Sequence, residues 1–464
     1  MAICRHEGTG IFYKKLIFNI INKKSVGTGL YCRSAAAGVM PGGTIPPSGA
    51  RQYFFNKLFC EAYFCFEKIS PARQGRMTLD FQDRAVLHLD LDAFYVAVEC
   101  LRDDSLRGKP LIIGGSSNRG VVASCSYEAR AKGVRSAMPM RQALQLCPEA
   151  TVLKGDMAAY SKHSALVRDL IEEEAPLFEQ ASIDEFYLDL TGMDQYIGCW
   201  KWSTELRQRI IRETGLPLSF GLSVNKTVSK IGAGEVKPNG TKLVPAGMEK
   251  SFLAPLPAGK IPQIGRETER RLALMGIRTC KTLSETPVYL LEREFGKSGL
   301  VMWKKANGED DSPVVPYREQ DSISSECTFP SDSMDLRFLQ DEIRRQTGQL
   351  AYELRALGKL SACVTIKLRY SDFNTFTKQA KLPYTAQDGL LTEHALALFE
   401  RLYERRQAIR LLGVRFSDLV PGSSQLNLFD DTEKESRLLA AMDKIRDRFG
   451  KNAVGKGSNT KGKR

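Results

Sequence analysis

Apolar and polar residues alternate in a short stretch near residue 90. Between residues 86 and 92, three leucines alternate with polar residues, which are His88, Asp90 and Asp92. This period of two predicts a strand with one buried face and places Asp90 and Asp92 on the same side. Neighbouring carboxylates raise each other's pKa, so the pair makes chemical sense mainly when a cation lies between it and a substrate. A solvated strand edge would show the same pattern.

A second acidic pair, far downstream, favours the cation. Residues 181–190 also predict a strand, in which Asp184 and Glu185 are adjacent. Because side chains alternate along a strand, one of these acids must lie at a turn or a sheet edge for both to reach one ion. Two such strands brought together would supply three oxygen ligands of the kind that Mg²⁺ prefers when it bridges phosphate oxygens.

The remaining pattern indicates a multidomain α+β protein. At 464 residues, about two to four domains are expected. Helices are predicted over residues 127–132, 156–175, 203–213, 335–357, 392–406 and 433–449. Further strands are predicted over residues 111–115, 120–123, 218–223, 363–370 and 409–416. In the helix over residues 156–175, the buried stripe is expected to include Leu166, Leu170 and Ile171.

Four motifs resemble those of the Y-family DNA polymerases, and most closely the bacterial DNA polymerase IV (DinB-type) branch. They occur in the family's order and spacing, at residues 90–95 with Val98 and Glu99, 123–130, 182–185 and 237–240. The resemblance runs from about residue 77 to the C-terminal region. It implies a ferredoxin-like palm, small fingers, a helical thumb with a helix-hairpin-helix, and an α+β little-finger domain.

The resemblance also implies domain limits. The expected palm comprises residues 77–98 and 155–245, with the fingers at 99–154, the thumb at 246–316, a polar linker at 317–325 and the little finger at 326–420. Residues 421–464 would form a tail that carries a peptide for binding the bacterial sliding clamp. Residues 1–76 lack a sustained period and are expected to be a disordered extension, with Met77 as the hypothetical true start.

For the catalytic site, the resemblance implies that Asp90, Asp184 and Glu185 hold two Mg²⁺ ions, with the Leu91 carbonyl as an added ligand. Glu185 would also lie near the attacking 3′-hydroxyl of the primer. Asp92 is assigned a supporting role. The aromatic ring of Tyr95 would lie under the sugar and exclude a 2′-hydroxyl. The alternative, a plain core aromatic, applies better to Phe94.

A group of residues resembles the family's triphosphate clamp. Tyr127 and Arg130 are three positions apart on a predicted helix and therefore share one face, from which an arginine can bind phosphate oxygens in a bidentate manner. Ser124 and Lys237 complete the clamp. Without the neighbouring motifs, a solvated helix would explain the pair equally well. Residues 232–234 depart from the family's usual Ala-Ser-Asp.

Three further segments are predicted to bind partners. Residues 261–277 resemble a helix-hairpin-helix whose turn at Gly265 would bind a DNA phosphate, although Gln263 stands where many relatives have glycine. Lys367 and Arg369 share one strand face, which suits a phosphate backbone and equally a solvated edge. The clamp-binding peptide would use its glutamine as a hydrogen-bonding group and its apolar residues as anchors, at Gln425, Leu428 and Phe429.

Composition narrows the class of protein. The net charge is +13 with a pI near 9.1, but residues 1–76 hold eleven Lys or Arg against three acids, so the remaining chain argues only weakly for a polyanionic partner. The eleven cysteines form no C-x-x-C pair and the four histidines are scattered, which disfavours a zinc site or a disulfide framework. There is no apolar run long enough to span a membrane. A monomer located in the cytoplasm is expected.

We therefore expect a low-fidelity, template-directed translesion DNA polymerase without a proofreading exonuclease. It would add deoxynucleotides to the end of a primer on template DNA. One alternative is a catalytically inactive relative that binds DNA and the sliding clamp as a scaffold. Another is a nucleotide cyclase on a similar acidic sheet, which would leave the hairpin and the clamp peptide unexplained.

Overall fold

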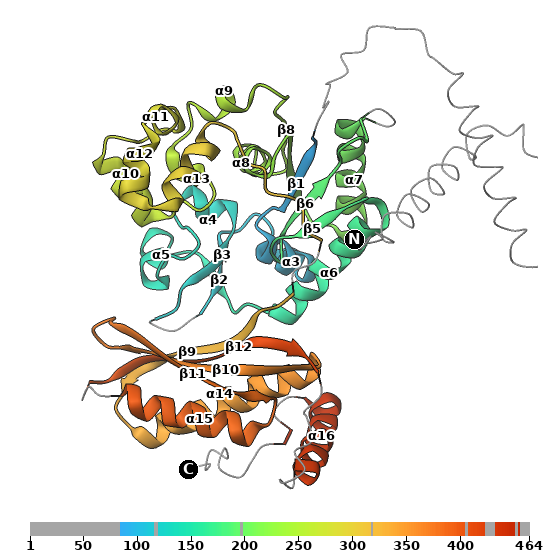
Figure 1. The fold of residues 1–464 in the computed structure, drawn as a ribbon. Coiled ribbons are helices and arrows are strands. Elements are labelled where there is room, and N and C mark those ends of the chain that lie inside the picture. Colours follow the sequence, from blue (N-terminus) through green and yellow to red (C-terminus); the bar gives the residue numbers. More distant parts are fainter. Residues whose placement is uncertain are drawn as a thin grey trace, which may run out of the picture. The chain divides into compact units, whose positions relative to one another are not determined.

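The computed structural model describes residues 84–115, 119–194, 198–316, 319–403, 407–422, 432–450 and 453–454. The chain forms two compact units, of which the first ends at Pro316, and short segments near residues 116–120 and 139–141 group with the second. Each unit is described by itself (Figure 1). The expected N-terminal extension at residues 1–76 and the clamp peptide at Gln425, Leu428 and Phe429 lie outside the described residues.

A five-stranded sheet forms the centre of the first unit. Its order is β5-β6-β1-β7-β8, comprising Phe178–Gln180, Glu185–Asp189, Val86–Leu91, Leu218–Ser223 and Thr241–Leu243. The central strand β1 pairs antiparallel with β6 and β7, and β8 runs parallel to β7. The strand expected over residues 218–223 is thus confirmed, whereas β8 was not expected.

Helices bury both faces of this sheet. The leucines of β1 pack into one core with α3 (Phe94–Arg102), α6 (Met157–Glu174) and α7 (Cys199–Thr214). The other face is covered by α8 (Lys226–Glu235), whose backbone is so close to β7 that a Cβ on Gly221 would lie 2.1 Å from the Ser229 carbonyl oxygen. The prediction of a single buried face for β1 is therefore wrong, because β1 is the central strand and His88 is fully buried against α8 and its neighbours.

The buried stripe of the helix α6 differs in one residue from the prediction. Its buried residues are Tyr160, Ser164, Val167 and Ile171, while Leu166 is 46% exposed. One residue of offset rotates a side chain by about 100° around a helix, so Leu166 points away from the stripe that contains Ile171. The residue Leu170 is half-buried at its margin.

A smaller sheet and a helical segment complete the first unit. The sheet has the order β3-β2-β4, formed by Val122–Cys125, Leu111–Gly114 and Thr151–Leu153, with α4 (Tyr127–Ala131) and α5 (Met140–Leu146) beside it in sequence. The expected limit between palm and fingers at residue 98 falls inside α3. The helical segment comprises α9 to α13, with bounds Glu249–Leu253, Arg266–Leu274, Cys280–Glu285, Val288–Phe295 and Lys297–Ala306.

The second unit is a four-stranded antiparallel sheet with the order β11-β10-β12-β9. Its strands are Thr375–Thr385, Lys359–Tyr370, Ile409–Pro421 and Ser322–Ser333. The helices α14 (Leu336–Ala356) and α15 (Asp388–Leu402) contribute to one core with these strands. The final helix α16 (Thr432–Phe449) joins α14 through Arg355, which contacts Asp443 at 2.6 Å.

Two strands of this unit differ from the sequence prediction. The strand β9 begins at Ser322, inside the stretch expected to be an irregular linker, and β11 was not expected. Both are edge strands with few buried apolar residues, such as Ile323 in β9 and Leu382 in β11, so their alternation is too sparse to stand out.

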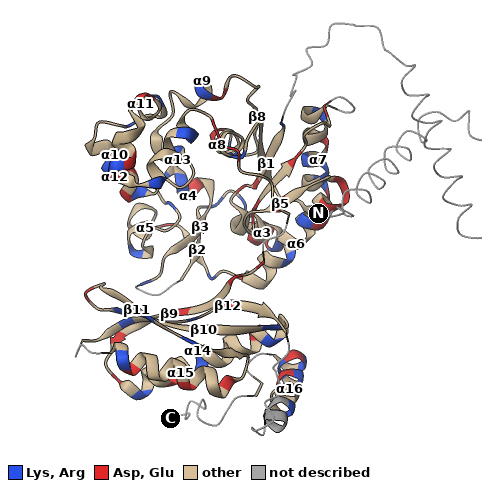
Figure 2. Ribbon diagram, viewed as in Figure 1, with Lys and Arg blue, Asp and Glu red and all other residues tan. Residues whose placement is uncertain are grey.

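Acidic and basic residues are interspersed along helices of both units (Figure 2). Within the described part of the chain, no helix is both long and apolar enough to cross a membrane.

Candidate active site

The two acidic segments meet at one end of the central sheet. In the antiparallel register of β1 and β6, Asp90 lies directly opposite Glu185. Asp184 precedes β6 in a bend, and its carbonyl accepts a 3.0 Å hydrogen bond from the Leu91 amide. Opposed residues on antiparallel strands have Cβ atoms about 5 Å apart, so these acids can act on one site. The prediction that one member of the second pair lies at a turn is confirmed.

Two lysines hold these carboxylates. Lys237 forms an ion pair with Asp90, and Lys230 donates to both carboxylate oxygens of Glu185, at 2.6 and 2.5 Å. The Asp184 carboxylate accepts a 2.6 Å hydrogen bond from the Ser182 hydroxyl. Sequence reasoning missed Lys230, which lies on α8.

Burial dominates the electrostatics of the site. Burial raises the pKa of Asp90 to about 6; the Lys237 ammonium opposes this rise, while the charges of Glu185 and Asp184 reinforce it. Burial also lowers the pKa of His88 well below its usual value, with a further contribution from Lys230 and Lys237. His88 is therefore neutral at pH 7, and its Nε2 lies 4.0 Å from Glu185 Oε2. Its ring packs against Tyr187 at a centroid distance of 4.6 Å.

The acids suit a divalent cation by type and by backbone position. Carboxylate oxygens are the ligands that Mg²⁺ prefers, and Asp90, Asp184 and Glu185 converge at one sheet end. Among the described residues, however, no group of three or more acidic, histidine or cysteine side chains is arranged to hold a metal ion as it stands. In the present arrangement, lysine ammonium groups and the Ser182 hydroxyl contact these carboxylates. Side-chain rotations would have to precede metal binding, so the ligand role stays a prediction.

Asp92 has a different environment from Asp90. It follows the end of β1, is 1% exposed, and accepts hydrogen bonds from the Ser219 hydroxyl at 3.0 and 2.9 Å. The backbone amide of Asn239 also donates a hydrogen bond to Asp92 Oδ2, at 2.6 Å. Its carboxylate is therefore engaged by protein donors, and its supporting role stays a prediction.

Two residues of the predicted triphosphate clamp, Tyr127 and Lys237, contact these acids. Tyr127 begins α4 and its hydroxyl is 3.4 Å from Asp92 Oδ1, while the Arg130 guanidinium lies 4.8 Å from the centre of the Tyr127 ring. Tyr127 and Arg130 thus share one face of α4, as predicted. Lys237 contacts Asp90. Ser124 is buried on the neighbouring strand β3.

Tyr95 is half-buried in the first turn of α3, with its ring stacked on Tyr160 at a centroid distance of 4.3 Å. Burial and the charge of Asp184 raise the pKa of the Tyr95 hydroxyl. Phe94 is 3% exposed, so the reading as a core aromatic holds for Phe94. Sequence reasoning did not identify Tyr160, whose hydroxyl donates to Glu99 at 2.7 Å.

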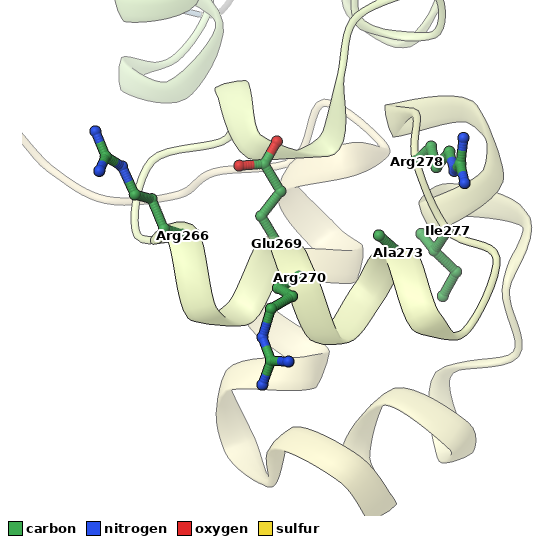
Figure 3. Close-up of a pocket in the computed structure, with 6 residues that line it drawn as sticks. All are labelled: Arg266, Glu269, Arg270, Ala273, Ile277 and Arg278. Carbon is green, nitrogen blue, oxygen red and sulfur yellow. The ribbon is translucent and has the colours of Figure 1, made fainter. Parts of the chain in front are cut away.

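The predicted hairpin is present in the helical segment. Gly265 is the residue before α10, and Gln263 adopts a φ of 81°, so the glutamine takes the left-handed conformation that glycine would adopt more easily. A hollow beside α10 is lined by Arg266, Glu269, Arg270, Ala273, Ile277 and Arg278 (Figure 3). Arg266, Arg270 and Arg278 contribute positive charge to this hollow, but Glu269 also lines it and Arg270 is paired with Glu267 at 2.8 Å.

The basic pair of the second unit lies on one face of β10. Lys367 and Arg369 are partly exposed, opposite the fully buried Ile366 and Leu368, as predicted. Lys367 contacts Glu326 at 2.9 Å, and Arg369 donates to the Thr375 hydroxyl at 2.8 Å. Part of the positive charge of this face is therefore neutralised within the sheet.

Comparisons with known proteins agree with this architecture. Residues 89–234 match the impB/mucB/samB family, residues 320–428 match its C-terminal domain, and residues 259–310 match the thumb domain of DNA polymerase-iota. A relative from Dehalococcoides mccartyi (strain CBDB1), named DNA polymerase IV, is 37% identical over 375 residues, which are 80% of this chain and 96% of the relative. A protein of the same name from Listeria innocua is 37% identical over 341 residues, covering 73% of this chain and 96% of the relative.

Solved structures show the same likeness. A Y-family DNA polymerase chimera aligns with a TM-score of 0.65 at 25% identity, over 72% of this chain and 99% of the chimera. An insertion ternary complex of Dbh DNA polymerase aligns with a TM-score of 0.54 at 25% identity, again over 72% of this chain and 99% of that chain. The acidic sheet, the helical hairpin segment and the second α+β unit together define a palm-type polymerase. The chain belongs to the Y family of DNA polymerases, the impB/mucB/samB family, which comprises DNA-directed DNA polymerases.

Proposed function

We propose that this protein is a translesion DNA polymerase that adds deoxynucleotides to a primer 3′-end with two Mg²⁺ ions. The observation that carries the proposal is the register of β1 and β6, in which Asp90 faces Glu185, while Asp184, the residue before β6, lies at the same sheet end. A polymerase active site needs acids at this point because their carboxylates hold the divalent cations that neutralise the negative charge of the triphosphate.

In this proposal Asp90, Asp184 and Glu185, with the Leu91 carbonyl, hold the ions. Bound Mg²⁺ would lower the pKa of the primer 3′-hydroxyl and neutralise the negative charge of the triphosphate. Lys230 and Lys237 release the carboxylates before this, and Lys237 then becomes free to bind phosphate oxygens. The contacts that link Lys237 to Asp90 and Lys230 to Glu185 support such an exchange.

The remaining residues would bind and select the nucleotide. Arg130 and Tyr127 project from α4 beside the acids, and Arg130 can contact two phosphate oxygens at once. Ser124 would add a hydroxyl from β3. The ring of Tyr95, stacked on Tyr160, would lie under the deoxyribose and exclude a 2′-hydroxyl.

Primer-template DNA and the sliding clamp are the proposed macromolecular partners. The hairpin at Gly265 and the face that carries Lys367 and Arg369 would contact DNA phosphates without reading sequence. The peptide with Gln425, Leu428 and Phe429 would bind the clamp. We further propose a cytoplasmic monomer without a proofreading exonuclease, in line with membership of the Y family.

Primer extension with Mg²⁺ tests this function. The wild-type protein should extend a primer on an undamaged template and on one with an abasic site, using deoxynucleotides. Asp184→Ala should reduce the rate at least about a hundredfold, because an active-site charge is lost. Glu205→Ala, which removes an exposed acid on α7, is the matched control and should leave the rate unchanged.

The alternatives give different results in the same assay. A protein that binds primer-template DNA but extends no primer would be the inactive scaffold. Formation of a cyclic nucleotide from a nucleoside triphosphate without DNA would indicate a cyclase. Either result would contradict the proposed function.

A further inference from the structure

Asp92 joins three segments that are far apart in the sequence. Its carboxylate accepts hydrogen bonds from Ser219 on β7, from the Asn239 amide and from Tyr127 on α4. It is 1% exposed and lies just beyond the end of β1. A buried carboxylate is costly unless its oxygens are satisfied, and here protein donors from three directions satisfy them.

The first of these segments is the turn at residues 237–240. The Asn239 amide donates to Asp92 at 2.6 Å, and the Gly240 amide donates to the Ser219 hydroxyl at 3.1 Å. At Gly240, a Cβ would lie 2.0 Å from the Val236 carbonyl oxygen, so this position requires glycine. The turn is therefore attached to the sheet through Asp92 and Ser219. The attachment to Asp92 is made by Asn239, two residues beyond Lys237.

The second segment is the start of α4. Tyr127 is its first residue, and its hydroxyl reaches Asp92 Oδ1 at 3.4 Å, while the Arg130 guanidinium lies over its ring. Asp92 thus contacts Tyr127 directly and Arg130 through Tyr127. The Lys237 ammonium lies 4.0 Å from the same oxygen, Asp92 Oδ1. The Asp92 carboxylate therefore contacts groups from two parts of the first unit. One is the five-stranded sheet with the turn at residues 237–240, and the other is α4.

The chemistry of the contacts requires a carboxylate. The Asn239 amide and the Tyr127 hydroxyl direct hydrogens at Asp92, and an ionised carboxylate accepts at both oxygens. An asparagine would replace one acceptor with an NH₂ group and remove the negative charge near Lys237. Hydrogen bonds to a charged acceptor are stronger than those to a neutral one, so the substitution should loosen the turn and α4 without a change in volume.

We propose that Asp92 is a positioning residue for the incoming triphosphate. It holds the turn that follows Lys237, and the Tyr127 side chain, in position next to Asp90. Asp92 itself binds neither a metal ion nor the nucleotide. The inference rests on the proposed function, because Lys237, Tyr127 and Arg130 matter here as triphosphate ligands. Loss of Asp92 therefore weakens nucleotide binding more than it slows the chemical step.

Two buried serines on β7 provide a matched test. Ser219 and Ser223 lie four residues apart on the same strand face, and both are fully buried. Ser219 supports Asp92, whereas the Ser223 hydroxyl has no hydrogen-bond partner among the described residues. Ser219→Ala should raise KM for deoxynucleotides about three- to tenfold, and Ser223→Ala should not, because only the former weakens a charged hydrogen-bond network.

Asp92→Asn should have the larger effect. We expect its KM for deoxynucleotides to rise about ten- to a hundredfold, with a smaller fall in kcat and unchanged affinity for primer-template DNA. Equilibrium binding of an α,β-imido deoxynucleotide to the protein-DNA complex in Mg²⁺ should weaken in parallel. This second measurement does not depend on catalysis.

The outcomes separate the inference from the proposed function. Absence of primer extension by the wild type contradicts the proposed function, while nucleotide affinity still reports on Asp92. A lower kcat with unchanged KM and nucleotide affinity in Asp92→Asn would overturn the positioning role. If Asp92→Asn does not fold, equal KM values for Ser219→Ala and Ser223→Ala would overturn it instead.

Discussion

Two lysine side chains neutralise the acidic end of β1 and β6. Lys237 pairs with Asp90 and Lys230 with Glu185, while burial raises the pKa of Asp90 to about 6. Alternation within a short apolar strand marks Asp90 in the sequence, whereas the adjacent Asp184 and Glu185 were predicted from their place in a second acidic strand and from the family resemblance. Lys230 was missed because a lysine on an amphipathic helix normally faces solvent, and here the close approach of α8 to β7 brings it to the acids.

The raised pKa of Asp90 predicts a pH-dependent stability difference. Asp90 binds its proton more tightly in the folded chain than in the unfolded chain, where its pKa is about 4. The contribution of this tighter proton binding to the free energy of unfolding is therefore fully present below pH 4 and is lost as the pH rises through about 6. Relative to Asp90→Asn, the metal-free wild type should lose up to about 3 kcal/mol of unfolding free energy over this range.

Urea unfolding in EDTA between pH 4 and pH 8 measures this difference. Global titration of other groups cancels when the wild type is compared with Asp90→Asn at each pH. Parallel stability curves for the two proteins would show that the pKa of Asp90 is not raised in the folded chain.

At the residue scale, the position of Tyr95 predicts that the protein discriminates between deoxynucleotides and ribonucleotides. Tyr95→Ala should raise ribonucleotide incorporation relative to deoxynucleotide incorporation at least about tenfold, because the ring that blocks the 2′-hydroxyl is removed. Tyr95→Phe keeps the ring stacked on Tyr160 and should retain the discrimination. The ratio of kcat/KM for the two sugars is the measurement, and an unchanged ratio in Tyr95→Ala would refute the assignment.

At the scale of elements, periodicity predicted the strongly patterned segments. The helix expected over residues 156–175 is Met157–Glu174, and the strand at Leu218–Ser223 agrees at both ends. The edge strands β9 and β11 were missed because most of their residues are polar. Burial of both faces of β1 was also missed, since His88 alternates with leucines like a solvated residue and is buried only because α8 covers it.

The hairpin turn before α10 contains backbone strain that can be relieved. Gln263 has a φ of 81°, a conformation that favours glycine. Gln263→Gly should raise the unfolding free energy of the protein by about 1 kcal/mol in urea titrations. A neutral or destabilising effect would mean that the Gln263 side chain compensates for the strain, for example through its contact with Lys305.

Gly276 provides the reverse control for this prediction. It also has a φ of 81°, and a Cβ there would meet no atom within 4 Å. Gly276→Ala should therefore lower the unfolding free energy by a similar amount, about 1 kcal/mol, through backbone strain alone.

At the scale of the whole molecule, the attachment of α16 depends on a partly buried ion-pair network. Arg355 contacts Asp388 and Asp443, each at 2.6 Å, and so ties α14 to both α15 and α16. The sequence predicted α16 from its apolar spacing but not this network, because the three charges are far apart in the chain. Such charges are recognisable only after α14, α15 and α16 have been packed together.

Loss of Arg355 should release α16. Arg355→Ala leaves the buried Asp388 without its ion-pair partner, whereas Asp443 keeps Arg446 at 3.1 Å; the loss should cost the second unit about 3 kcal/mol. Hydrogen exchange at the amides of α16 should then accelerate. Arg345→Ala, which removes an exposed arginine paired with Glu342 within α14, should change stability by less than about 1 kcal/mol. Equal exchange of α16 in both variants would contradict the network's role.

The central claim is that Asp90, Asp184 and Glu185 share divalent ions at the end of the β1 and β6 strands. Manganese anomalous scattering from a crystal of the protein with primer-template DNA and an unreactive deoxynucleotide tests this claim most directly. The account predicts two manganese peaks within bonding distance of these carboxylates, with Lys230 and Lys237 no longer paired to Glu185 and Asp90. A bound nucleotide with the lysines still in place and no manganese at these three acids would contradict it.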